Sequence, residues 1–176
     1  MATQIARPTE AEYPPFFRQY IHHVPGDDLA VMLKAPMAQS LSIWHTFPQE
    51  RELFTYAEGK WTPREILGHI IDTERIMQYR ALAIARGEKQ SLPGFDENSY
   101  VKNAQYNDRP LATLFAEFTV VRLATQLLFQ QSINDADLLR TGTANGRAIT
   151  PRAIAWIIFG HELHHIALLK ERYLTT

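Results

Sequence analysis

Two long helical segments, each opened by the dipeptide Thr-Pro, restrict most strongly what this chain can fold into. In the first, Thr62 can cap the helix, Pro63 fits its first position, and Glu65 completes a capping box. Apolar residues at helical spacing follow, so we predict a helix over residues 63–86. The same signals predict another helix over residues 151–172. Two rods of this length favour a bundle of helices packed side by side.

Two further long helices are predicted from the remaining apolar patterns. Residues 111–129 read as an ordinary amphipathic core helix. Residues 29–44 predict another, which Asp27 or Asp28 can cap. Pro36 lies in its middle and is expected to kink it, because proline removes one backbone hydrogen bond.

Short elements complete the expected fold. Thr9 and Glu12 form a plausible capping box ahead of a short helix over Tyr13–Tyr20. Asn145-Gly146 is typical of a tight hairpin turn. No alternating pattern is long enough for a larger sheet. The predicted fold class is therefore all-α, a four-helix bundle with a short N-terminal helix and a long crossover loop, forming a single domain over residues 1–176.

The charged residues nearly balance, with 18 lysines and arginines against 19 aspartates and glutamates. There is no basic surplus to neutralise phosphates, so nucleic acid is not an expected partner. We find no uninterrupted apolar run of transmembrane length and no signal-like N-terminus, so we expect no membrane partner and a soluble, cytoplasmic protein.

The chain contains no cysteine. Disulfides, thiolate metal ligands and a cysteine nucleophile are therefore excluded. Any thiol chemistry would need a thiol brought by another molecule.

Three histidines predict a metal site. His161 and His165 lie four residues apart in the last predicted helix and leave it on one face, about one turn apart. His69, in the helix over residues 63–86, is the natural third ligand, because a site of three histidines leaves a coordination position for water or substrate. The alternative is three buried histidines in an ordinary core, but each would then need its own polar partner.

Helical spacing places other polar residues near this site. Asp72 lies one turn from His69 and is a candidate for orienting a ligand imidazole through a hydrogen bond. Glu162 follows His161 and is a candidate for moving protons near the metal. The inward stripe that contains His69 also includes three further residues, Thr73, Ile76 and Arg80.

Other charged residues and histidines are expected outside the site. We predict that Glu74 and Arg75 lie at a helix flank or a subunit contact, and that the His22-His23 pair faces solvent. His45 and His164 are the two residues that could supply a fourth ligand or pack beside the site.

The connection over residues 88–109 is long, and connections of this length are usually functional. Phe95, Asp96 and Tyr100 could wall a pocket and recognise substrate. Alternatively, the two aromatic residues only fasten a crossover loop to the bundle.

His161-Glu162-Leu163-His164-His165 also matches H-E-x-x-H, the metallopeptidase signature in which the glutamate is the general base. In such enzymes the third ligand lies downstream, yet only eleven residues follow His165, and Glu171 is the single carboxylate among them. No predicted strand is available to hold an extended peptide. A metallopeptidase is therefore the less favoured interpretation.

Several segments beyond the histidines are also distinctive: Lys60–Glu65, Gly68–Arg75, Tyr79–Ala81, Leu92–Asn98, Gly142–Gly146 and Gly160–His165. With them, and with a third histidine 92 residues before His161, the chain resembles the DinB/YfiT-like family of metal-binding four-helix bundles over nearly its whole length. Pro36 departs from the pattern of the first long helix in this family.

The resemblance implies up-down-down-up connectivity and homodimers in many members. It also implies a divalent metal held by the residues that match His69, His161 and His165, most often zinc or nickel, with iron or manganese as other candidates. Relatives include bacillithiol S-transferases and mycothiol-dependent isomerases, while many members have no assigned reaction.

The function we expect is that of a metal-dependent enzyme acting on a small-molecule substrate. The metal would lower the pKa of the ligand in its open position. That ligand would be water, giving a hydrolase, or a low-molecular-weight thiol as co-substrate, giving an S-transferase or isomerase. The alternative is a non-catalytic dimeric binding or stress-response module with a structural metal, which a fourth protein ligand would favour.

Overall fold

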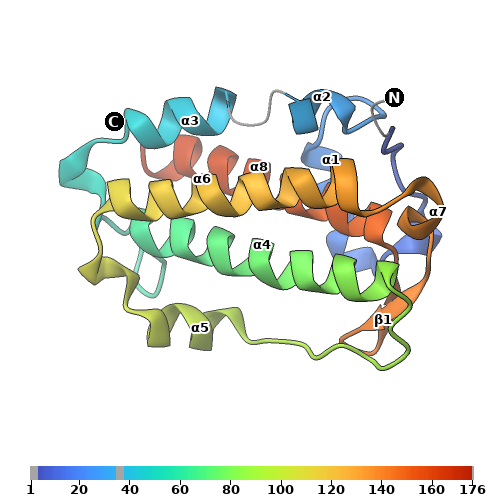
Figure 1. Ribbon diagram of the computed structural model, residues 1–176. Helices are drawn as coiled ribbons and strands as arrows, with labels where there is room; N and C mark the ends of the chain where they lie inside the picture. The colour runs from blue at the N-terminus through green and yellow to red at the C-terminus, as the bar shows by residue number, and fades with distance from the viewer. Residues whose placement is uncertain (1–3, 35–37, 176) are drawn as a thin grey trace.

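Four long helical segments lie side by side in the computed structural model, which describes residues 4–34 and 38–175 (Figure 1). Three are single helices, namely α4 (Pro63–Ala85), α6 (Leu111–Leu127) and α8 (Pro151–Arg172). The fourth comprises α2 (Ala30–Lys34) and α3 (Ala38–His45). Pro36, where we predicted a kink, lies outside the described residues.

The directions of these segments confirm the up-down-down-up connectivity (Figure 1). The segment of α2 and α3 runs one way, α4 and α6 run the other way, and α8 returns in the direction of α3. Because α4 and α6 are parallel neighbours, the chain between them has to travel back along the bundle. Residues 86–110 form this crossover.

The predicted capping residues begin the two longest helices. The Thr62 hydroxyl accepts the backbone N–H of Glu65 at 3.2 Å, and the Glu65 carboxylate accepts that of Thr62 at 2.8 Å. The hydroxyl of Thr150 accepts the N–H of Ala153 at 3.1 Å. Both helices thus satisfy amide groups that would otherwise have no partner at the N-terminus.

The crossover is more regular than we predicted for residues 88–109, because it contains α5 (Glu97–Ala104). Asp96 begins this helix by accepting the backbone N–H of Ser99 at 3.0 Å. A 3₁₀ turn over Tyr106–Asp108 then leads toward α6. The Asp-Glu-Asn-Ser sequence is thus a helix start that we did not predict.

The N-terminal helix begins later than predicted. We expected it over Tyr13–Tyr20, whereas α1 spans Arg18–His23. Pro14 and Pro15 explain the difference, since proline restricts its own conformation and that of the residue before it. The chain forms a 3₁₀ turn over Pro15–Phe17 before α1 begins.

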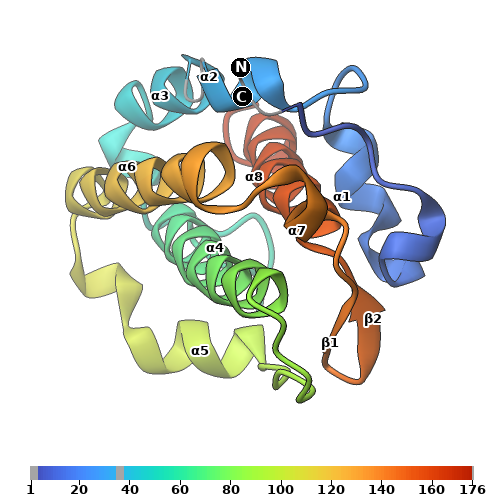
Figure 2. The same ribbon diagram turned by 45° about the vertical axis from the view of Figure 1, so that its right-hand side comes forward.

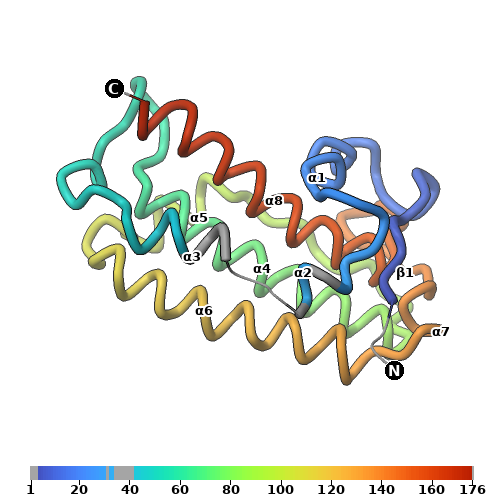
Figure 3. Tube along the Cα trace, turned by 90° about the horizontal axis from the view of Figure 1, so that it is seen from above, coloured from blue at the N-terminus to red at the C-terminus, as the bar shows by residue number. Residues whose placement is uncertain are grey.

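The N-terminal segment is fastened to α8. The predicted capping box of Thr9 and Glu12 is present, around a 3₁₀ turn. The Glu12 carboxylate also accepts hydrogen bonds from the Thr150 hydroxyl at 3.0 Å and from Nε of Arg152 at 2.8 Å. Figure 3 shows α1 beside α8, at the end of the bundle where β1 lies.

The predicted hairpin is present as β1 (Gly142–Ala144) and β2 (Arg147–Ile149), paired antiparallel. Its turn residues Asn145 and Gly146 both have positive φ, 50° and 69°, as this kind of turn requires. Figure 2 shows the hairpin below α7 (Asp135–Leu138). The crossover contacts it, because the N–H of Leu92 donates to the carbonyl of Thr143 at 2.9 Å.

The core consists of two apolar clusters with buried polar groups between them. One cluster includes Met77, Ala81, Ile84 and Ala85 of α4 and residues 153–159 of α8. The other includes Ile66, Leu67, Ile70 and Ile71 of α4 and Ile166 and Leu169 of α8. Between these stretches, three helices contribute buried charged groups, Glu74 from α4, Arg122 from α6 and Glu162 from α8.

The segment Leu111–Ser132, which is α6 with the π-helical turn after it, is long and apolar enough to cross a membrane by length and composition alone. We did not predict this. In the bundle, α6 packs against α4 and α3, and 44% of its most apolar stretch is buried. Part of α6 is thus packed within the bundle.

Candidate metal centre

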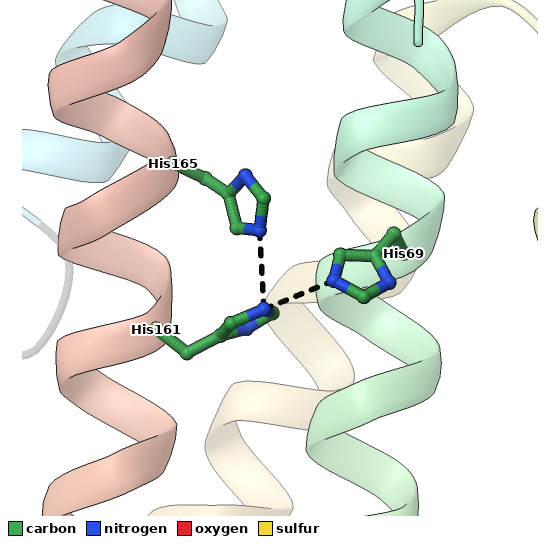
Figure 4. A group of neighbouring side chains, drawn as sticks. All are labelled: His69, His161 and His165. Carbon is green, nitrogen blue, oxygen red and sulfur yellow. Dashed lines mark hydrogen bonds between the residues drawn. The ribbon is translucent and has the colours of Figure 1, made fainter. Parts of the chain in front are cut away.

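Helices α4 and α8 bring the three predicted ligands together (Figure 4). Nε2 of His161 lies 3.0 Å from Nε2 of His69 and 3.1 Å from Nε2 of His165. One ligand nitrogen of each residue lies within 4.8 Å of the other two. All three side chains are buried. Three imidazole nitrogens therefore surround one point.

Burial keeps these imidazoles neutral. It lowers the pKa of His69 to about 4, and it lowers the pKa of His161 and His165 well below the ordinary value of 6.5. Neighbouring histidines add to the effect on the last two, because two imidazolium charges repel. A neutral imidazole offers a lone pair to a metal ion, so the site is in the binding form at neutral pH.

Hydrogen bonds alone do not satisfy this cluster. Nε2 of His161 faces two other nitrogens, and with one proton or one lone pair it cannot make two good hydrogen bonds. Nδ1 of His165 is buried and has no partner among the described residues. A cation would use all three lone pairs at once, and the ligands of a tetrahedral zinc lie roughly 3.3 Å apart. The donor set thus fits a divalent metal.

The three histidines line a cavity of about 670 Å³. Its walls come from α4, α8, the hairpin, the crossover and the segment before and within α1. Near the histidines the walls are aromatic, with the ring of Trp61 4.7 Å from that of His69 and the ring of Tyr20 5.2 Å from that of His161. Pockets of about 300–1,000 Å³ are typical of small-molecule sites.

Tyr20 and Trp61 are cavity residues that we did not predict. Trp61 directly precedes the Thr62 cap, and Tyr20 comes from α1, which packs along α8. Burial raises the pKa of Tyr20, and Glu97 adds to the shift, so the phenol stays protonated and able to donate a hydrogen bond. Their positions depend on contacts distant in sequence, which no local pattern specifies.

Neither candidate for a fourth ligand joins the cluster. His45 is exposed and lies with its ring 4.9 Å from that of Phe115. His164 is half-buried, and its Nδ1 lies 3.4 Å from Nε2 of His23. Within residues 4–34 and 38–175, the group of possible metal ligands around this point consists of the three predicted histidines.

Glu162 does not face the cavity, contrary to the proton-transfer role that we predicted. Its side chain is buried in the core, and its carboxylate accepts a hydrogen bond from Nη1 of Arg122 at 2.5 Å. It is also absent from the cavity lining, so it is not placed to act on a ligand there. The glutamate of the H-E-x-x-H pattern is thus held by Arg122 in this structure.

Glu74 is not at a helix flank, as we predicted, but in the same ion-pair network. Its carboxylate accepts two hydrogen bonds from Arg122, both at 2.8 Å, and one from the hydroxyl of Thr125 at 2.5 Å. Arg75, by contrast, is exposed and pairs with Glu117. We missed Arg122, although it follows the apolar Phe118 by four residues and therefore shares its buried face.

Asp72 also has a different partner from the one predicted. Its carboxylate accepts a hydrogen bond from the Tyr106 hydroxyl at 2.5 Å, and it bonds none of the three histidines in the described structure. Burial and Asp72 raise the pKa of Tyr106, which keeps the phenol protonated as the donor. Asp72 thus fastens the crossover to α4 rather than orienting a ligand.

The predicted substrate loop is divided between three places. Phe95 lines the cavity of the histidines. Tyr100 is 5.3 Å from the Phe95 ring and lines a smaller neighbouring pocket. Asp96 caps α5 through its side chain. Of the three residues, Phe95 is therefore the one placed to contact a ligand near the histidines.

The metal-free protein is expected to lose stability as the pH falls from about 6.5 toward 4. The folded-state pKa of His69 is about 4, while an unfolded histidine has a pKa near 6.5, so the unfolded chain binds more protons in this window. The contribution of His69 to the free energy of unfolding is fully present above pH 6.5. It decreases by about 3 kcal/mol as the pH falls to 4. Urea unfolding in the presence of a chelator at several pH values measures this pH dependence of the free energy of unfolding.

His69→Gln is the matched variant for this measurement, because glutamine keeps a polar side chain that does not titrate. Carboxylates also titrate in this range, so the difference between wild type and variant isolates the histidine. An equal loss of stability in both proteins between pH 6.5 and 4 would contradict the prediction.

The fold and the histidine cluster together define a helical-bundle protein with a candidate metal site. The chain belongs to the DinB superfamily, whose sequence profile matches residues 32–169. Among solved structures it is similar to YfiT from Bacillus subtilis, with 17% identity and a TM-score of 0.71, over 93% of this chain and 89% of that one. YfiT is described as a probable metal-dependent hydrolase with an unusual four-helix bundle topology. No curated protein matches the sequence.

Proposed function

We propose that this protein is a metal-dependent enzyme acting on a small molecule, with a divalent cation held by His69, His161 and His165. The observation that carries the proposal is the convergence of three neutral imidazoles on the wall of a cavity of about 670 Å³. No fourth ligand completes the group within the described residues. A three-ligand site of this kind leaves a position for water or substrate.

Hydrolysis is the reaction we propose first. The description of YfiT as a probable metal-dependent hydrolase supports it. A divalent cation at such a site supplies a Lewis acid that polarises a water molecule or a thiol. Three imidazoles suit zinc, nickel or iron, and we propose zinc or nickel.

The chain's own residues would hold and enclose the reactants. The histidines stay neutral through burial, so no proton competes for their lone pairs near pH 7. The rings of Trp61 and Tyr20 stand beside them and limit the access of bulk water. The Tyr20 hydroxyl stays protonated and can donate a hydrogen bond to a bound molecule.

Thiol-dependent S-transfer or isomerisation is the second candidate. The volume of the cavity favours it, because about 670 Å³ accommodates a small thiol together with a second reactant. The chain has no cysteine, so the thiol would be a separate co-substrate. The third possibility, a structural metal in a non-catalytic module, is less well supported, since such sites usually have four protein ligands.

Elemental analysis of untagged protein purified without added metal tests the proposal. We expect about one zinc, nickel, iron or manganese per chain, lost in His69→Ala and in His161→Ala. His45→Ala is the matched control, because His45 is exposed and outside the cluster. The retained metal then decides which ion to use in screens for ester or amide hydrolysis and for thiol transfer. A metal-free wild type that stays folded and binds none of these ions would exclude the proposed function.

A further inference from the structure

The cavity contains a buried guanidinium at a distance from the histidines. Arg80 lies on α4, eleven residues after His69, and lines the same cavity. Thr73 and Met77 line it between them. We predicted Ile76 for the inward stripe that contains His69, whereas Met77 is the residue of this turn that lines the cavity. Arg80 is only 6% exposed, so its charge lies mostly out of reach of bulk water.

Arg80 has no carboxylate partner in the part of the chain that the structure describes. Its Nη2 donates to the carbonyl oxygen of Pro93 at 2.7 Å, and its Nη1 contacts the sulfur of Met77 at 3.8 Å. Its Nε is buried without any partner. Glu97 is the one acidic residue in the cavity lining, and it forms no ion pair with Arg80.

The second buried arginine of the core shows what is missing at Arg80. Arg122 is fully buried and pairs with two carboxylates, those of Glu74 and Glu162. A buried cation is costly unless an opposite charge accompanies it. The chain thus balances the charge of Arg122 with two carboxylates. Arg80 has no carboxylate partner among the described residues; its guanidinium lies 5.8 Å from the Phe95 ring centroid and lines a cavity.

Other groups in the cavity add to its positive and polar character. Burial lowers the pKa of Arg80 from its ordinary value, the direction expected for a cation without a counter-charge, although a guanidinium stays charged in proteins. Arg147 of β2 also lines the cavity and forms no ion pair with any described residue. The hydroxyl of Thr73 is buried and has no partner there either.

We infer that the cavity binds a small molecule bearing an oxyanion group, a carboxylate or a phosphate, which pairs with Arg80 while the reacting group lies at the histidines. Only the placement of the reacting group rests on the proposed function. The planar guanidinium offers parallel N–H donors that match both kinds of oxyanion. Eleven helical residues rise about 16 Å, and a side chain on a helix leans toward its N-terminus, here toward His69. In a ligand that reaches both sites, several bonds must therefore separate the oxyanion from the reacting group.

Calorimetric titration of the full-length protein with phenyl phosphate, phenylacetate and neutral phenylacetamide tests this inference. We expect at least one of the two anions to bind, and Arg80→Met to weaken that binding about 10–100-fold without changing the affinity for the amide. Arg75→Met is the matched control, since Arg75 is exposed on the same helix and does not line this cavity. The anion that binds more tightly identifies the group on the substrate.

The same titration in His161→Ala separates this inference from the proposed function. Binding that persists there and disappears in Arg80→Met supports Arg80 as the anion partner, whatever becomes of the metal site. Binding that is lost in His161→Ala and kept in Arg80→Met overturns the inference, because the anion would then lie at the histidines. Failure of both anions to bind the wild type also overturns it.

Thermal unfolding distinguishes a binding arginine from a structural one. Without ligand, Arg80→Met should keep or raise the Tm, because the substitution removes an uncompensated buried charge. A Tm lower by several degrees with unchanged anion binding would make Arg80 a structural residue and contradict the inference. Arg80→Lys, which keeps the charge but not the planar fork, should weaken anion binding to a smaller degree.

Discussion

Replacing Arg122 with leucine is expected to lower the free energy of unfolding by about 3–5 kcal/mol, measured by urea denaturation at pH 7. The side chain is fully buried between three helices. Its guanidinium donates to Glu74 of α4 at 2.8 Å and to Glu162 of α8 at 2.5 Å. Without it, the carboxylates of Glu74 and Glu162 would lose the guanidinium with which they pair in the core.

The electrostatics of the network support this size of effect. Burial alone would lower the pKa of Arg122, but Glu162 and Glu74 raise it above its ordinary value, so attraction outweighs desolvation. The cost should therefore come mainly from the carboxylates left behind. Adding Glu74→Gln and Glu162→Gln to Arg122→Leu should recover much of the lost stability, because neutral groups are less costly to bury.

Arg109→Leu is the matched control for Arg122→Leu. Arg109 also pairs with a glutamate, Glu117, at 2.5 Å, but its side chain is 40% exposed. Ion pairs at the surface contribute about 0–1 kcal/mol. If the two variants lose the same small amount of stability, the buried network does not hold the three helices together.

Local signals in the sequence predict the long helices of this fold and their order. Thr62 and Thr150 cap their helices through contacts three residues away, so the sequence nearby contains all the information needed. The histidine cluster follows from the same regularity, because the spacing of His161 and His165 fixes their common face on α8. His69 needed the further assumption that α4 and α8 are neighbours, which rested on the need for a third ligand beside His161 and His165.

The residues that sequence reasoning misplaced depend on which helices face each other. Helical spacing puts Arg122 on a buried face, but it does not show that Glu74 and Glu162 lie opposite. Asp72 was expected to bond a histidine, and it bonds Tyr106 because the crossover passes beside α4. Each misplacement is a contact between residues at least 34 positions apart.

Two neighbouring residues of α8 serve different parts of the structure. His161 faces the cavity, while Glu162, about 100° further round the helix, faces the core and Arg122. The ion pair therefore fixes the rotation of α8 next to the point where two of the three histidines leave it. A glutamate directly after a candidate ligand can thus help to position that ligand without lining the cavity.

Substituting Gly160 with alanine is expected to destabilise the protein by about 3 kcal/mol, although alanine usually stabilises a helix interior relative to glycine by about 0.5–1 kcal/mol. A Cβ at this position would overlap with the backbone carbonyl of Tyr20, so α1 would have to move away from α8. The Tyr20 ring, which contacts that of His161, would move with it. With the proposed metal bound, we therefore also expect the variant to lose it to a chelator faster than the wild type.

Gly68→Ala separates a backbone clash from a side-chain clash. A Cβ there would overlap with the buried ring of Tyr106, which is also hydrogen-bonded to Asp72, so a loss of stability is expected through displacement of the crossover rather than of α1. Urea denaturation of both variants gives the comparison, and metal release into a coloured chelator gives the effect on the site. A Gly160→Ala protein as stable as the wild type would mean that α1 can shift freely on α8. In that case α1 would be a movable cover over the histidines, and Tyr20 would not be a fixed part of their surroundings.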